Sequence, residues 1–337
     1  MEKKKILFIY KNKTLAKKFV EHLKKNNYEV YEFFNEVIPL YDISKLQKLE
    51  NIFHRFFRKD IQYIHKIYTK NFNNHSQKKL RELKKCKTKF DYCLVIRGDL
   101  IPEFVINHAR SISKKMVDYQ LDGLSVSSKI LDYQKYFDRI FVFDPEDVKR
   151  HPSFNLVFLP NCYFGETDFT QPSEIDLLYI GQFIEKRHQQ LSSIHNYLES
   201  QQMHYSSYTS LYQGRDFIPL HHKILHHKIS TTYQENLDFV KKSKTLIDFK
   251  RDEHDGLSLR FFEAMQYGKK IITDNVSVKN YEFYHPNNIF VTDFVHLDGI
   301  LEFIQKPYHP LPETLIEQYG FKNWIKVILG KSTNNKK

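Results

Sequence analysis

The residues with the clearest potential for chemistry lie in one segment, 248–265, which reads Asp-Phe-Lys-Arg-Asp-Glu-His-Asp-Gly-Leu-Ser-Leu-Arg-Phe-Phe-Glu-Ala-Met. The pattern predicts a strand that ends in a charged loop, followed by a helix that opens at Gly256. A helix N-terminus carries unpaired N–H groups and about half a positive charge, so it favours phosphate. Ser258 and Arg260 would add a hydroxyl and a guanidinium in the first turn. The segment therefore predicts a phosphate site.

A carboxylate follows at a distance that suits a ribose. Glu263 would lie two helical turns from Asp255, and one carboxylate can accept hydrogen bonds from both ribose hydroxyls. Its neighbours on the helix are apolar, and a carboxylate on an apolar face needs a partner. Arg260 could instead be a structural ion-pair partner of Glu263. With the phosphate site, Glu263 indicates a nucleoside diphosphate ligand.

Three further acids follow predicted strands in the first half of the chain. Asp99 comes after the strand 90–96, and Asp118 and Asp122 lie at and beyond the end of the strand 115–119. In open α/β sheets ligands bind beyond the carboxyl ends of the strands. Each acid could act as a general base toward an acceptor hydroxyl, and the sequence favours none of the three.

The elements that must position these residues form two successive β-α-β series, which predict two doubly wound α/β domains with a ligand cleft between them. We expect an N-terminal domain over 1–168 and a polar linker over 166–174. A second domain over 174–312 and a final helix over 313–337 that packs back on the first domain complete this expectation.

The positive charge is concentrated in one predicted helical insertion. Residues 45–89 hold fourteen Lys or Arg and three acids, or +11 of the net charge of +12. Leu49, Phe53, Phe56 and Phe57 can share a face among these cations. Two interpretations stay open: a solvated helix whose aromatics join the core, or a helix pair that lies on anionic lipid.

A histidine-rich stretch, 221–228, raises the possibility of a metal site, because histidines at i and i+4 share a helix face. No carboxylate or Cys is spaced in sequence to complete it, so we expect a solvated helix and no metal. Cys86, Cys93 and Cys162 are too widely spaced for a zinc motif or a disulfide framework, which predicts buried free thiols.

Composition excludes several classes of protein. The stock of 28 Phe, 22 Tyr and 1 Trp argues against disorder over most of the chain. No apolar run approaches the ~20 residues that span a bilayer, and the N-terminal run 6–10 is too short for a signal peptide. We expect a cytoplasmic protein, peripheral on the inner face of the membrane.

The chain resembles the GT-B glycosyltransferases, and within them the CgeB-like group of bacterial capsule and lipopolysaccharide enzymes. Asp255 and Glu263 are similar to the paired acids of retaining GT-B enzymes, with Asp in place of the usual first Glu. The resemblance covers about 90–290, and its motifs are 255–264, 268–275, Ser243-Lys244, 144–147 and Tyr179-Ile180-Gly181.

This resemblance implies a nucleotide-sugar donor on the second domain and no required metal. Gly256, Leu257 and Ser258 would meet the diphosphate, Glu263 would hold the ribose, and Arg187 sits where such enzymes often place a basic ligand. Arg187 could equally be a surface cation at a helix start. Together with Arg260 it would stabilise the departing diphosphate.

The expected function is transfer of a sugar to a growing surface glycan or its lipid-linked precursor. The competing class is a membrane- or nucleic-acid-associated binding module that uses the patch at 45–89; its charge is localised, which argues against nucleic acid. A sugar-nucleotide epimerase of similar fold is a third possibility.

Overall fold

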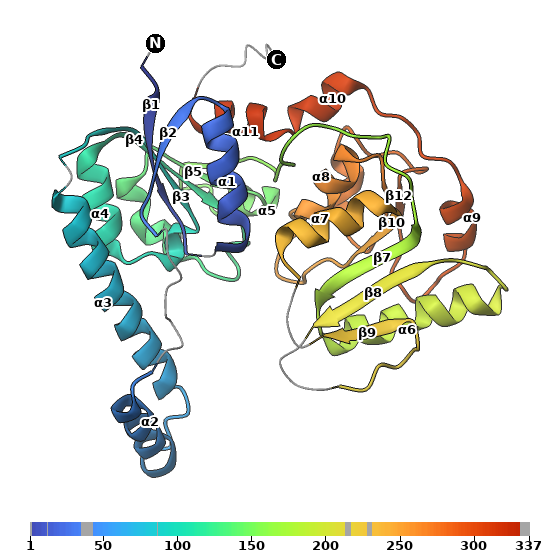
Figure 1. The fold of residues 1–337 in the computed structure, drawn as a ribbon, viewed down its shortest axis with the longest axis horizontal. Coiled ribbons are helices and arrows are strands. Elements are labelled where there is room, and N and C mark those ends of the chain that lie inside the picture. The colour runs from blue at the N-terminus through green and yellow to red at the C-terminus, as the bar shows by residue number, and fades with distance from the viewer. Residues whose placement is uncertain are drawn as a thin grey trace. The chain divides into compact units, whose positions relative to one another are not determined.

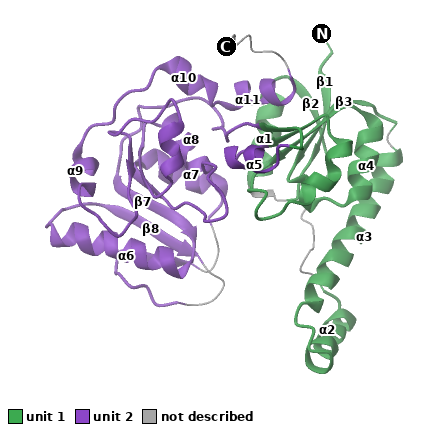
Figure 2. Ribbon diagram, turned by 180° about the vertical axis from the view of Figure 1, so that it is seen from behind, with its two compact units in different colours: residues 1–141, 153–157 green, residues 142–152, 158–337 purple. Residues whose placement is uncertain are grey.

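The chain folds into two compact units. The structure, a computed structural model, describes residues 2–11, 13–34, 43–85, 87–212, 217–227 and 231–330. The first unit comprises residues 1–141 and 153–157, and the second comprises 142–152 and 158–337 (Figure 2). Residues 166–174, where a linker was expected, are irregular chain within the second unit.

The sheet of the first unit has the strand order β2-β1-β3-β4-β5-β6 (Figure 1). β1 pairs in parallel with both β2 and β3, so the direction of winding reverses between β1 and β3. The strands are β1 (Lys4–Ile9), β2 (Tyr28–Glu32), β3 (Phe90–Ile96), β4 (Ser113–Gln120), β5 (Arg139–Val142) and β6 (Leu156–Phe158).

Helices of the first unit pack on this sheet, except for a helical hairpin. α1 (Lys13–Lys25) packs near β2, and α4 (Glu103–Ile112) packs on β3 and β4. The basic segment forms two helices, α2 (Lys45–Phe57) and α3 (Tyr63–Lys85), with a short η2 (Lys129–Tyr136) and η1 (Gly98–Leu100) elsewhere. α3 buries Ile67, Phe72 and Leu80, whereas α2 buries no residue.

The sheet of the second unit has the order β12-β11-β10-β7-β8-β9, and all of its neighbouring strands are parallel. Its winding reverses between β7 and β10, which places the topological switch point there. The strands are β7 (Ile175–Gln182), β8 (Ser207–Tyr212), β9 (Ile224–His227), β10 (Ser243–Asp248), β11 (Lys270–Thr273) and β12 (Ile289–Val291).

Alternate residues of these strands face two separate apolar layers. Leu178 and Leu246 join a core with α7 (Tyr233–Lys242), α8 (Leu259–Gln266) and α10 (Glu313–Gln318). Leu177 and Ile247 join another core with α6 (Glu185–Ser200) and α9 (Ile300–Gln305). The remaining helices of this unit are α5 (Pro145–Arg150), η3 (Val276–Asn280) and α11 (Phe321–Ile328). The period of two along each strand thus gives a three-layer unit.

Two sequence expectations about elements were wrong. The helix expected over 221–228 is the edge strand β9, because residues 224–227 pair with β8. The helix expected from 313 is split into α10 and α11 near Gly320, whose backbone bridges to Tyr163 within the second unit. Tertiary pairing decided both cases over local helical pattern.

Cys93 and Cys162 are free and buried, as expected, and burial raises the pKa of both thiols; Cys86 lies outside the described residues. Within the described ranges, we find no helix with the length and apolar character that a membrane crossing requires.

Candidate functional site

The carboxyl ends of β7 and β10 bring together the basic residues predicted for the diphosphate. The loop after β7 leads into α6, which carries Arg187 in its first turn, and the loop after β10 leads to Ser258 and Arg260 on α8. Ligands of doubly wound sheets bind at such a switch point. Arg187 and Ser258, 71 positions apart in sequence, therefore lie at one edge because of the strand order.

Asp248 lies at the centre of this group, at the end of β10. Its carboxylate accepts a hydrogen bond of 2.6 Å from the Ser258 hydroxyl. Burial raises the pKa of Asp248, and the nearby guanidinium groups of Arg260 and Arg187 partly oppose that rise. Ser258 in turn caps α8, since its Oγ accepts from the Arg260 N–H at 3.2 Å. Asp248 thus orients the cap of the helix.

Both guanidinium groups are fixed by backbone carbonyls. Arg187 Nη2 donates to the Phe249 carbonyl at 3.5 Å, and the guanidinium lies 5.8 Å from the centre of the Phe249 ring. Arg260 Nη2 donates to the Ile180 carbonyl at 3.2 Å. A guanidinium has five N–H donors, so these bonds leave capacity on both side chains for an anionic ligand.

The helix begins later than expected. α8 starts at Leu259 with Ser258 as its N-cap, so Gly256 does not open it. A Cβ at Gly256 would lie 2.6 Å from the Phe143 ring and 2.8 Å from the Phe143 carbonyl oxygen. Glycine is therefore needed there for close packing, whatever ligand binds. Asp255 and Glu263 do not share one helix, and the expected spacing of two turns was wrong.

The loop before α8 is held from several directions. The Asp255 carbonyl accepts from the Ser277 hydroxyl at 2.6 Å and from the Asn275 amide at 3.2 Å. The Asp255 N–H donates to Asp144 Oδ2 at 3.2 Å, and its carboxylate forms an ion pair with Lys250. The segment is preorganised rather than loose.

Leu257 contributes to the same loop through its backbone and to the core through its side chain. Its carbonyl accepts from the Asn161 amide at 2.9 Å. Its side chain is buried in the core that includes Phe261. Any contact with a diphosphate at this position would therefore use main-chain atoms.

Glu263 is buried, at 5% exposure, and it faces α7. Burial and the Glu263 carboxylate together raise the pKa values of Tyr233 and Tyr267. Among the described residues Glu263 forms no ion pair with Arg260, whose guanidinium points to β7 instead. The alternative of a structural Arg260–Glu263 pair is therefore not supported.

The three candidate bases of the first unit are organised by Arg97. This residue adopts a left-handed backbone conformation, with φ of 59°, at the end of β3. Its Nε and Nη2 donate to the two oxygens of Asp99 at 2.8 and 2.9 Å, and it also forms an ion pair with Asp122. Asp118 accepts from the Gly98 N–H and from Gln120 Nε2, each at 2.8 Å.

Access to solvent separates these acids. The side chain of Asp99 is 0% exposed, and Asp118 is fully buried, which raises its pKa to about 8. The side chain of Asp122 is 31% exposed. The structure brings all three acids together, but only Asp122, among these three, has a side chain that is open to solvent.

The histidine pair at 221 and 222 meets a carboxylate that sequence spacing did not reveal. Glu199, at the end of α6, lies 3.3 Å from His221 Nε2 and 3.4 Å from His222 Nε2. However, His221 Nδ1 accepts the Lys223 N–H at 3.1 Å, so Nε2 carries the ring proton and can donate to Glu199. Hydrogen bonding therefore accounts for this contact without a metal ion.

Three solved structures cover almost the whole chain and give TM-scores above 0.5. A UDP-forming α,α-trehalose-phosphate synthase from Burkholderia xenovorans has a TM-score of 0.57 at 9% identity and covers 98% of this chain and 99% of its own. An α-glucosyltransferase in complex with UDP-glucose and DNA containing an abasic site has a TM-score of 0.53 at 13% identity, with 97% and 94% coverage. The fold is GT-B.

A third GT-B match is the N-terminal domain of trehalose-6-phosphate phosphatase from Candida albicans. Its TM-score is 0.54 at 12% identity, with 97% coverage of both chains. No family model and no curated protein matches the sequence. At these identities the comparisons establish the GT-B fold, and the argument for function depends on the site.

Sequence reasoning missed Asp248, Asp144 and Tyr233 as parts of this site. Asp248 could have been found, because an acid at the last position of a buried strand lies at the ligand-binding edge. Asp144 belongs to a motif of the resemblance, but its contact with Asp255, 111 positions away, and that of Tyr233 with Glu263, 30 positions away, are not visible in any local pattern.

Proposed function

We propose that this chain is a glycosyltransferase that moves a sugar from a nucleotide-sugar donor to a capsule, lipopolysaccharide or similar surface glycan. One observation carries the proposal: Arg187, Ser258 and Arg260 converge around Asp248 at the switch point of the second GT-B sheet. The α-glucosyltransferase of the same fold binds UDP-glucose, which supports a nucleotide-sugar donor. The resemblance of 243–275 to the CgeB-like group supports a surface glycan as the acceptor.

In this proposal the diphosphate lies against the N-terminus of α8. Free N–H groups at the start of α8 donate to it, and Arg187 and Arg260 supply positive charge. The Ser258 hydroxyl donates its proton to Asp248 and so orients this end of the helix. Negative charge grows on the leaving diphosphate in the transition state, so groups fixed beforehand stabilise that state more than the ground state. Two guanidinium groups can supply this stabilisation without a metal ion.

Glu263 binds the ribose in this proposal, and Asp122 is the base candidate with solvent access. Glu263 lies beside the buried hydroxyl of Tyr233, so a ribose held by Glu263 would lie near that hydroxyl. Asp122, which forms an ion pair with Arg97, would accept a proton from an acceptor hydroxyl if the reaction inverts the anomeric centre.

The donor site is tested by Glu263→Gln, which keeps the shape and removes the charged acceptor. Hydrogen bonds to a charged group contribute ~1.5–3 kcal/mol, so affinity for nucleoside diphosphates should fall on the order of ten-fold or more. Isothermal titration with UDP, GDP and ADP measures this, and the exposed Glu313→Gln is the matched control. Equal affinity in the wild type and Glu263→Gln would move the site elsewhere.

The basic hairpin α2–α3 supports docking on an anionic membrane. On α2, Leu46, Leu49, Phe56 and Phe57 are 77%, 65%, 71% and 77% exposed. The interpretation that these side chains belong to the core is therefore wrong for α2. An exposed apolar helix face flanked by cations is typical of a helix that lies in a membrane interface.

Liposome co-sedimentation tests this docking. Each basic residue near an anionic surface contributes about 1 kcal/mol, so Arg55, Arg58, Lys59 and Lys66 all changed to Glu should abolish binding to anionic vesicles. The control carries the same change of charge on exposed lysines elsewhere, namely Lys17, Lys24, Lys279 and Lys322. Equal loss in both variants, or equal binding of the wild type to neutral vesicles, contradicts the proposal. Tight RNA binding without lipid binding would favour the binding-module alternative.

A further inference from the structure

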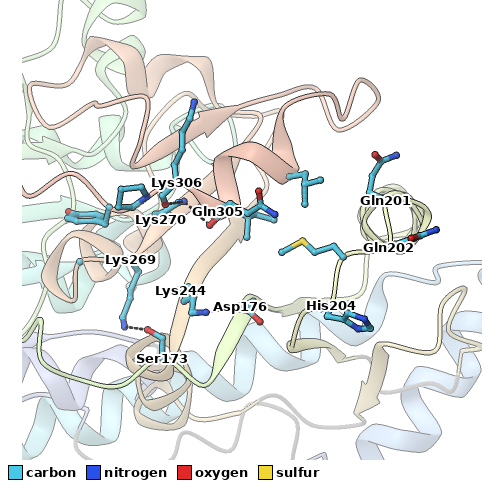
Figure 3. A pocket seen from close by; sticks show the side chains of 16 residues that line it. Ser173, Asp176, Gln201, Gln202, His204, Lys244, Lys269, Lys270, Gln305 and Lys306 are labelled. Atoms are coloured by element: carbon cyan, nitrogen blue, oxygen red, sulfur yellow. Dashed lines mark hydrogen bonds and ion pairs between the residues drawn. The ribbon is translucent and has the colours of Figure 1, made fainter.

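A second cavity lies at the opposite edge of the second sheet from the donor site. Its volume is about 730 Å³, within the range of small-molecule pockets. It opens at the amino ends of β7, β10 and β11, near Asp176, Lys244 and Lys270. Figure 3 shows the lysines on one side and Gln201, Gln202 and His204, which follow α6, on the other. The site at 248–258 lies at the carboxyl ends of the same strands.

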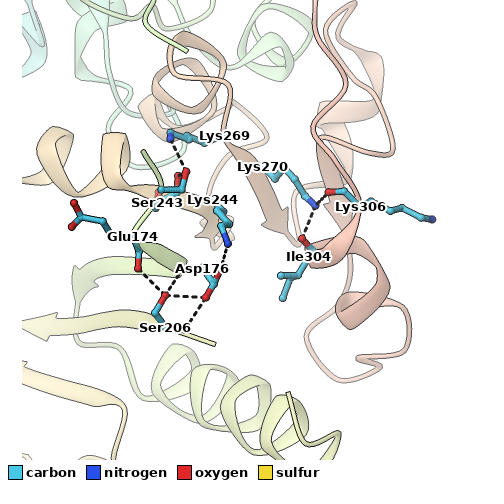
Figure 4. A network of polar contacts seen from close by, with 10 residues as sticks. Glu174, Asp176, Ser206, Ser243, Lys244, Lys269, Lys270, Ile304 and Lys306 are labelled. Atoms are coloured by element: carbon cyan, nitrogen blue, oxygen red, sulfur yellow. Dashed lines mark hydrogen bonds and ion pairs between the residues drawn. The ribbon is translucent and has the colours of Figure 1, made fainter. Parts of the chain in front are cut away.

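The lining of this cavity is positively charged. Four lysines (Lys244, Lys269, Lys270, Lys306) line it, against the single carboxylate of Asp176. Lys244 forms an ion pair with Asp176 at 2.6 Å, and Asp176 also accepts from the Ser206 N–H and hydroxyl (Figure 4). Lys306 forms an ion pair with Glu302 at 2.8 Å. Lys269 and Lys270 therefore carry the excess charge.

Lys270 has an internal structural role. Its ammonium donates to the carbonyls of Phe303, Ile304 and Lys306, at the C-terminal end of α9. Those three bonds use all of its donors, and burial lowers its pKa to about 8. Lys270 adds charge to the wall but has no free hydrogen for a ligand.

Lys269 is the residue that lacks internal compensation. It is 6% exposed, and its ammonium donates to the Ser173 hydroxyl at 3.4 Å (Figure 3). Within the described ranges no carboxylate oxygen lies within 4.0 Å of it; Asp168 acts only at longer range. A buried ammonium with one long hydrogen bond is costly unless an anion joins it.

The neutral polar groups of the lining suit a ligand with hydroxyls. Gln201, Gln202 and Gln305 present amides at the rim, and Tyr308 adds an aromatic ring. We propose that this cavity binds a sugar phosphate, with its phosphate on Lys269 and Lys244 and its hydroxyls on the glutamine amides. The proposal does not depend on the donor site, from which α8 separates it: Ser258 caps one end of that helix and Lys269 follows the other.

Isothermal titration with glucose 6-phosphate as the probe tests the proposal, with inorganic phosphate and glucose in parallel. Lys269→Met keeps most of the length of the side chain and removes the charge, so affinity should fall at least ten-fold. The exposed Lys322→Met and the donor-site variant Glu263→Gln should bind like the wild type. Lys244→Met, on an exposed lysine of the same wall, should weaken binding several-fold and serves if Lys269→Met does not fold.

Several outcomes would overturn the proposal. These are an absence of binding at millimolar probe, equal affinity in the wild type and Lys269→Met, or loss of binding in Glu263→Gln, which would place the ligand at the other edge. Inorganic phosphate that binds as tightly as glucose 6-phosphate would remove the sugar from the ligand class, and glucose that binds as tightly would remove the phosphate.

Discussion

The carboxyl edges of the two sheets use charged residues in opposite ways. In the second unit, two guanidinium groups are each fixed to a backbone carbonyl and keep most of their donors. In the first unit, the Arg97 guanidinium forms hydrogen bonds to Asp99 and an ion pair with Asp122. Asp118 is buried and accepts hydrogen bonds from Gly98 and Gln120. The arginines of the second unit therefore keep donors that a ligand could use, whereas the arginine of the first unit is bonded to carboxylates of its own unit.

This difference shows why residue type and strand position are insufficient to assign a base. Asp99 and Asp118 stand where a general base was expected, yet both are enclosed and already bonded. A base must reach the proton that it removes. Arg187 and Ser258 also lie at a switch point, where Arg187 keeps guanidinium donors and the Ser258 hydroxyl donates to Asp248; their contact with a ligand stays a prediction.

Substitution of the two arginines should give the largest contrast. Arg97→Met would leave the buried Asp99 carboxylate unpaired, which typically costs about 3–5 kcal/mol. Arg187→Met loses a 3.5 Å hydrogen bond and a ring contact, so we expect at most ~1 kcal/mol in stability but weaker nucleotide binding. Thermal melts followed by circular dichroism, with UDP titration, measure both.

The control for Arg97 is Arg110→Met, which breaks an ion pair of 2.7 Å with Asp138 in the same unit. Both partners are more than a third exposed, so the cost should be about 0–1 kcal/mol. If Arg97→Met and Arg110→Met have the same melting temperature, the ion pairs of Arg97 do not stabilise the first unit. The proposed difference between the two sheet edges would then be wrong.

A smaller effect is expected from Asp118 at the first edge, whose buried carboxyl should make the stability of the protein depend on pH. Burial raises the pKa of Asp118 to about 8 from an ordinary 3.8, so between about pH 4 and 8 the folded state keeps a proton that the unfolded state has lost. Stability from this group is full below pH 4 and falls as the pH rises toward 8.

Asp118→Asn removes that ionisation while its amide can still accept from the Gly98 N–H. We therefore expect the melting temperature of Asp118→Asn, relative to wild type, to increase steadily from pH 5 to pH 8. Differential scanning calorimetry across this range measures the difference. A constant difference would mean that Asp118 is ionised in the folded protein at neutral pH.

Much of the fold could be predicted from the sequence because its signals are local. Short apolar runs at 90–96, 115–119 and 244–249 predicted strands with polar or charged residues at their carboxyl ends, and the repeated β-α-β order predicted two parallel sheets. Arg187 was proposed for the donor site from the family resemblance, and Ser258 from the predicted helix start; the observed strand order brings both to one edge.

The remaining features depend on contacts that sequence spacing does not show. Helix α8 begins at Leu259 rather than near Gly256, since Leu257 is drawn into the core and its carbonyl bonds to Asn161, 96 residues away. Glu199 contacts His221, which lies 22 positions later in the sequence. Lys269 lies in the wall of a cavity that Ser173 and residues of α9 also line. Such positions follow from packing of whole elements, not from a local motif.

The smallest expected effect concerns the cap of α8. Ser258→Ala removes an N-cap, worth ~1 kcal/mol, and also the hydroxyl that donates to the buried Asp248. Thr232→Ala removes the exposed cap of α7 in the same unit, without a buried acid, and is the matched control. Ser258→Ala should therefore cost up to about 1 kcal/mol more than Thr232→Ala, and the pKa of Asp248 should rise further because burial then acts with less opposition. Thermal melts at pH 6 and pH 8 measure the stability of both variants. The difference in melting temperature between them should be larger at pH 8, because at that pH it costs more either to keep Asp248 protonated or to ionise it without the Ser258 hydroxyl. Equal melting temperatures of the two variants at both pH values would show that the Ser258 hydroxyl does not stabilise Asp248. The hydrogen bond between them would then not be what orients the N-terminus of α8 at the second edge.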